Sequence, residues 1–123
     1  MISGGTFIDG DNRLIVRRLS PDGMSLKWSS IACTGRNGRG IAVDPRDQSV
    51  VVVGDGTGAN ADDNIRLCKH SSNGALLWGK DIDSDAGSDF GYGVAITPAG
   101  TIIAVGIIAA PGGSDAWVAA FAP

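Results

Sequence analysis

Short apolar runs alternate with turns rich in glycine, proline and aspartate along the whole chain. Most runs mix apolar and polar positions imperfectly, and some are apolar throughout, which is typical of strands buried on both faces. The pattern predicts β-strands at 13–19, 26–31, 40–44, 49–53, 65–70, 76–82, 93–97 and 101–107. It predicts no helix.

The runs recur with a period of about 51 residues, which indicates a tandem repeat. Gly23 and Gly74 lie 51 residues apart, and Trp28 and Trp78 lie 50 apart. The longer matching stretches are 11–23 with 62–74, 39–45 with 92–98, and 50–54 with 102–106. A third copy begins at 115–123. Each unit therefore consists of four short strands.

The turns between the first two strands of each unit carry hairpin chemistry. Pro21-Asp-Gly23 and Ser72-Asn-Gly74 contain residues that tolerate a positive φ. Composition agrees, because glycine accounts for 19 of the 123 residues and all 13 acidic residues are aspartate. A β-sandwich or barrel also uses short strands at such spacing, but the internal repeat favours a β-propeller with one repeat per blade.

Four segments carry a resemblance to bacterial β-propeller repeats of the SBBP type: 40–44, 74–78, 87–96 and 115–121. The Gly-x-x-x-Trp element at Gly74–Trp78 is also similar to the docking tryptophan of quinoprotein-type propellers. The resemblance implies four-stranded antiparallel blades, with the Gly-Ile-Ala-Val-Asp strand innermost. It implies a partial blade at 1–31, a complete blade at 39–82 and a partial blade at 91–123.

About two and a half to three blades cannot close a ring of four to eight. We therefore expect an incomplete propeller, completed by further copies of the chain or by the rest of a longer propeller. The implied role is an interaction scaffold without enzymatic activity. The alternative is a Ca²⁺- or glycan-binding domain of a secreted bacterial protein, extracellular or periplasmic. A quinone-dependent enzyme fragment would depend on the tryptophan element alone.

Charge is unevenly distributed between the two parts of the chain. Residues 1–48 carry a net charge of +2, and residues 49–123 carry −5. This polarity favours head-to-tail association. Arg13 and Arg17, on one face of a predicted strand, are the candidate contact residues. The acidic balance disfavours nucleic acid as a partner, and no apolar stretch is long enough to span a bilayer.

The two cysteines, Cys33 and Cys68, lack the close spacing of a metal site. Both lie in or beside predicted strands, so we expect buried free thiols, with a disulfide as the open alternative.

An aspartate-rich segment is the one candidate metal site, and Ca²⁺ is the only cofactor it suggests. Asp81, Asp83, Asp85 and Asp89 resemble a D-x-D-x-D loop, whose alternate carboxylates can converge on a hard cation. The glycine lies one position late for a standard Ca²⁺ loop, and the final bidentate glutamate is missing. A solvated connecting loop is the competing interpretation.

No catalytic constellation is found. His70 is the only histidine, so any Ser-His-Asp triad would need it. It aligns with Leu19 and Phe121, which are packing positions. The three tryptophans recur at repeat positions and are expected in the core, whereas Tyr92 is the aromatic residue best suited to stack on a ligand.

Overall fold

The computed structural model describes residues 2–8 and 11–123, with side chains from Arg13 onward. The described residues form ten β-strands and no helix. The strands are β1 (Ile2–Ile8), β2 (Asp11–Leu19), β3 (Leu26–Thr34), β4 (Asn37–Val43), β5 (Val50–Thr57), β6 (Asp63–His70), β7 (Leu76–Ile82), β8 (Phe90–Ile96), β9 (Ile102–Ala110) and β10 (Gly113–Phe121). The all-β prediction is confirmed. Most of the expected strands extend a few residues further than the apolar runs indicate.

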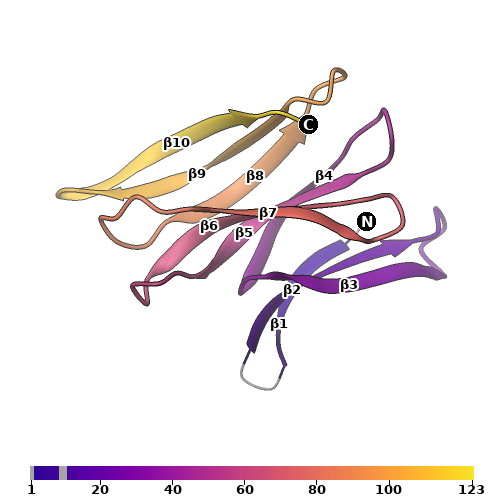
Figure 1. Ribbon diagram of the computed structural model, residues 1–123, viewed down its shortest axis with the longest axis horizontal. Coiled ribbons are helices and arrows are strands. Elements are labelled where there is room, and N and C mark those ends of the chain that lie inside the picture. The colour runs from indigo at the N-terminus through magenta and orange to yellow at the C-terminus, as the bar shows by residue number, and fades with distance from the viewer. Residues whose placement is uncertain (1, 9–10) are drawn as a thin grey trace.

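The strands pair into three separate antiparallel sheets (Figure 1). The first sheet has the order β1-β2-β3, the second β4-β5-β6-β7, and the third β8-β9-β10. In each sheet, consecutive strands are neighbours. The four-stranded second sheet lies between the two three-stranded sheets, contacting the first through β4 and β7 and the third through β4, β5 and β6.

The sequence repeat is also a structural repeat. Val53 pairs with Leu67 in the second sheet, and Val105 pairs with Val118 at the matching place in the third. By the same correspondence β4, β5 and β6 match β8, β9 and β10, while β5, β6 and β7 match β1, β2 and β3. Among the described strands, the first sheet therefore has no equivalent of β4, and the third has no equivalent of β7.

Two apolar cores separate the three sheets. Between the first and second sheets the core consists of Leu14, Val16, Cys33, Val50, Val52 and Cys68, with Trp28 and Ile41 packed against it. Between the second and third sheets it consists of Val51, Val53, Ile65, Leu67, Ile102 and Ala104. Because successive side chains in a strand point to opposite faces, β5 supplies alternate valines to both cores.

Trp28 fastens the first sheet to the second. Its indole nitrogen donates a hydrogen bond to the carbonyl oxygen of Ser72 at 2.9 Å. Its ring covers Gly74, where a Cβ atom would lie only 2.8 Å from the ring. Gly74 also has a φ of 94°, which favours glycine. The turn between β6 and β7 therefore requires glycine for two reasons.

The expectation of free thiols is wrong. Cys33 on β3 and Cys68 on β6 form a disulfide, with their Cα atoms 6.0 Å apart. Both residues face the core between the first two sheets, where the bond links neighbouring sheets covalently. The short-range sequence pattern could not reveal this pairing, because the two cysteines are 35 positions apart and meet only after the sheets stack.

We expect reduction of this disulfide to destabilise the fold by about 3–4 kcal/mol, because the bond closes a loop of 35 residues in the unfolded chain. Urea unfolding with and without dithiothreitol measures the difference. The Cys33→Ser/Cys68→Ser variant is the control, since its midpoint should not respond to the reductant. Equal midpoints for the oxidised and reduced wild-type chain would contradict the expectation.

Candidate functional site

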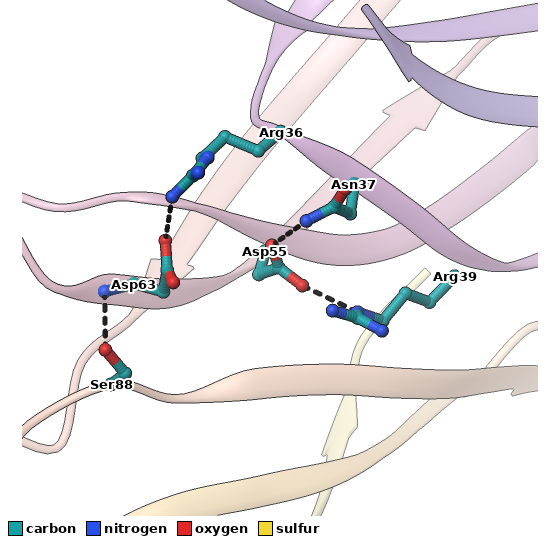
Figure 2. A network of polar contacts seen from close by, with 6 residues as sticks. All are labelled: Arg36, Asn37, Arg39, Asp55, Asp63 and Ser88. Carbon is teal, nitrogen blue, oxygen red and sulfur yellow. Dashed lines mark hydrogen bonds and ion pairs between the residues drawn. The ribbon is translucent and has the colours of Figure 1, made fainter.

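Asp55 is the centre of a polar network at the contact between the second and third sheets. Its carboxylate is buried and accepts hydrogen bonds from Asn37 Nδ2 at 2.8 Å and Arg39 Nε at 2.6 Å. Figure 2 shows the carboxylate between these two donors, which both come from β4. Asp55 is thus a buried charge whose neutralisation depends on one guanidinium.

The network continues along the same end of the second sheet (Figure 2). Arg36 pairs with Asp63 at 3.2 Å, and its backbone nitrogen donates to the carbonyl oxygen of Asp55. The backbone nitrogen of Asp63 donates to Ser88 Oγ at 3.1 Å. Ser88 precedes β8, so these bonds link the second sheet to the start of the third.

Arg39 also reaches the aromatic residues of β8. Its guanidinium carbon lies 5.0 Å from the ring centre of Tyr92 and 5.8 Å from that of Phe90. Cations at such distances are attracted to the ring faces. The pair with Asp55 therefore orients Arg39 toward Tyr92, the residue that the sequence indicates for ligand stacking.

Three of the four aspartates of the candidate metal segment have protein partners for their carboxylates. Asp81 pairs with Arg66 at 2.8 Å, and Asp83 accepts a hydrogen bond from the backbone of Asp85. Asp89 is buried and accepts bonds from the backbone nitrogen and hydroxyl of Ser84 and from the backbone nitrogen of Ala109. These three bonds are each 2.8 Å long. Asp89 therefore fixes its own loop against β9.

Within residues 13–123, whose side chains are described, no three acidic, histidine or cysteine residues are grouped so that they could hold a metal ion. The Ca²⁺ site stays a prediction from spacing alone, because Asp81, Asp83 and Asp89 each have a different partner in the protein.

Arg13 and Arg17, expected on one face of a strand, differ in exposure. Arg17 is exposed on β2. Arg13 is half-buried and lines a polar cavity of about 240 Å³ between the first two sheets, together with Arg66 and Asp81. The two arginines therefore do not form one surface cluster, and only Arg17 is freely accessible to a partner.

His70 is fully buried at the end of β6, in the position that Leu19 and Phe121 hold in the other units. The imidazole stacks on Trp28, with the ring centres 6.2 Å apart. Neither ring nitrogen has a hydrogen-bond partner among the described residues. Burial lowers the pKa of His70 below its ordinary value of 6.5. The expected packing role fits this environment.

The outward face of the third sheet is an apolar surface, and we name it the open face. Its exposed side chains include Val118 at 68%, Val105 at 43% and Tyr92 at 47%. Ala116 and Ala120 are exposed beside them on β10, and the guanidinium of Arg39 lies over the ring of Tyr92. A shallow pocket of about 390 Å³ opens here, lined by Tyr92, Val105, Gly106, Ala116, Trp117 and Val118.

The repeat shows which buried residues correspond to the exposed residues of the open face. Val105 and Val118 occupy the positions of Val53 and Leu67, which are fully buried because the third sheet covers them. The sequence analysis did not identify this surface. The aligned repeats contain a signal for it, because Val105 and Val118 align with core residues. Using this signal requires knowing which sheet each residue faces.

Neither a family model nor a curated protein matches the chain. Among the described residues there is no helix with the length and apolarity needed to cross a bilayer.

We expect Arg39→Ala to destabilise the chain by about 3–5 kcal/mol, because it leaves the buried Asp55 carboxylate without its charged partner. Adding Asp55→Asn to this variant should recover part of the loss, since it removes the unpaired charge. Chemical denaturation of both variants measures the difference. A double variant less stable than Arg39→Ala alone would contradict this account.

His70 should make stability fall as the pH drops from 7 to 5. The unfolded chain binds a proton near pH 6.5, whereas the buried imidazole resists it, so acid favours unfolding. Hydrogen bonds from Arg46 lower the pKa of Asp44 to about 2, so that carboxylate responds only at lower pH. His70→Leu should flatten the pH dependence of the unfolding free energy, and an unchanged slope would contradict the assignment.

Proposed function

We propose that the chain is a non-enzymatic β-propeller repeat module that acts as an interaction scaffold through the open face. The proposal includes the likeness to SBBP-type repeats and the treatment of each sheet as a complete or partial blade. The observation that carries it is a comparison of two residues that hold the same repeat position but differ in burial. Leu67 is fully buried between sheets, whereas its equivalent Val118 is 68% exposed.

The open face has the composition of an interior surface. Its β9 and β10 positions correspond to those that carry the core between the second and third sheets. Contiguous apolar patches on a protein surface mark interaction sites when they are large. The natural occupant of this face is a further β-sheet of the same repeat, because such a sheet covers the equivalent face within the chain.

The free edge of β10 supports the same proposal. In the second sheet β7 pairs with β6, whereas β10 has β9 as its only partner among the described strands. An unpaired edge offers backbone donors and acceptors to an added strand. A further repeat could therefore supply both the missing fourth strand and the next sheet.

The test uses Val118→Asp as a reporter of burial. In the natural chain it should change the unfolding free energy by no more than about 0.5 kcal/mol, because the side chain is exposed. In a chain extended after Pro123 by a second copy of residues 73–123, the same substitution should cost about 3 kcal/mol or more, because it buries a charge.

Val43→Asp is the matched control, since Val43 is 38% exposed on β4, away from the open face. Its effect should be the same in the natural and extended chains. If Val118→Asp is tolerated equally in both, no sheet has covered the open face and the proposed function fails.

A further inference from the structure

We infer that the open face binds the first sheet of a second copy of this chain, so that copies associate head to tail. The inference rests on the proposed function and goes further by naming the partner and its surface. The partner surface is the outward face of β2, with Ile15, Arg17 and Leu19, and we name it the entry face.

The chain already makes this contact between its own sheets. Trp117 and Phe121 on β10 point toward the second sheet and pack against its core. By the repeat, Ile15 and Leu19 hold the corresponding positions on β2. Both are apolar and half-buried. The entry face therefore presents apolar side chains where the third sheet uses Trp117 and Phe121.

Arg17 is the one charged residue among these positions. Its equivalent in the second sheet is Cys68, which is bonded to Cys33 on the outermost strand of the first sheet. In the part of the chain that the structure describes, the third sheet has no strand equivalent to β3. Arg17 of an incoming copy would therefore meet solvent at this position and would stay hydrated.

Charge selects this orientation over pairing of two open faces. Residues 83–123, which follow the second sheet, contain four aspartates and no arginine or lysine, whereas residues 13–34 of the first sheet contain four basic residues and one aspartate. Head-to-tail contact brings the acidic end of one copy to the basic end of the next, which is attractive. Pairing of two open faces would bring two acidic ends together.

The contact is small, which sets the conditions for detecting it. Three strands about 4.8 Å apart and about seven residues long give a footprint of roughly 300 Å² per copy. A stable complex usually buries about 800 Å² per partner. Assembly should therefore depend on protein concentration and weaken as salt rises, because screening reduces the attraction between the ends.

Complementation between two blocked variants tests the inference. Val118→Asp blocks the open face, and Ile15→Asp blocks the entry face. Each variant alone should be monomeric by analytical ultracentrifugation at concentrations where the wild-type chain assembles. An equimolar mixture should form a species of two chains and stop there, because one intact contact remains.

Arg17→Asp is a second entry-face variant at an exposed residue, with Lys27→Asp on β3 as the matched charge reversal. Arg17→Asp should weaken assembly more than Lys27→Asp, most clearly at low salt. Circular dichroism and melting temperatures confirm that each variant is folded.

Three results would overturn the inference. Wild-type chain that stays monomeric at every concentration excludes a second copy as the partner. Normal assembly of Ile15→Asp, with Val118→Asp monomeric, points to pairing of two open faces. If the mixture of Val118→Asp and Ile15→Asp remains monomeric, the open face does not bind the entry face. None of these results contradicts the proposed function, which the extended chain tests separately.

Discussion

The contact between successive sheets is the interaction on which the rest of this structure depends. A strand apolar at both its odd and even positions cannot face water on either side. In β5, Val50 and Val52 face the first sheet, while Val51 and Val53 face the third. The second sheet is therefore stable only as the middle layer. The disulfide and the tryptophan contact reinforce a stacking arrangement that these alternating side chains already require.

Polar groups at the sheet contacts have a different task from the valines. Apolar faces can slide past each other at small cost, because the hydrophobic effect has no direction. The Asp55–Arg39 pair and the bonds of Asp89 do have direction, since each needs particular donors at particular distances. Buried polar groups of this kind can favour one arrangement over alternatives, at some cost in stability. Across the sheet contact, the backbone nitrogen of Asp63 donates to Ser88 Oγ and the carbonyl oxygen of Asp63 accepts a bond from the backbone nitrogen of Asp89. Together with the position of Arg39 over Tyr92, these bonds fix how the third sheet lies on the second.

The sequence predicted the parts of this structure that depend on neighbouring residues. Alternation and turn residues located the strands, and the repeat related one sheet to another. What the sequence did not show concerns contacts between distant segments. Cys33 and Cys68 appear unrelated until β3 faces β6. Asp81 to Asp89 have the spacing of a cation loop, but spacing does not reveal that Asp89 turns inward to the backbone of Ala109. Asp55 gave no signal, because its arginine partner lies on another strand.

The same reasoning explains why the two ends of the stack are unlike. Leu67 lies inside the stack of sheets, and its equivalent at the open face is Val118. The side chain at this repeat position therefore stays apolar although it is exposed there. At the other end, Arg17 replaces the cysteine of the interior position. Solvent exposure alone would favour polar residues at both ends. The open face is apolar, and the entry face is cationic and partly apolar. The inferred head-to-tail contact joins two surfaces of these kinds. The proposed function therefore depends on the surfaces that the repeat leaves uncovered.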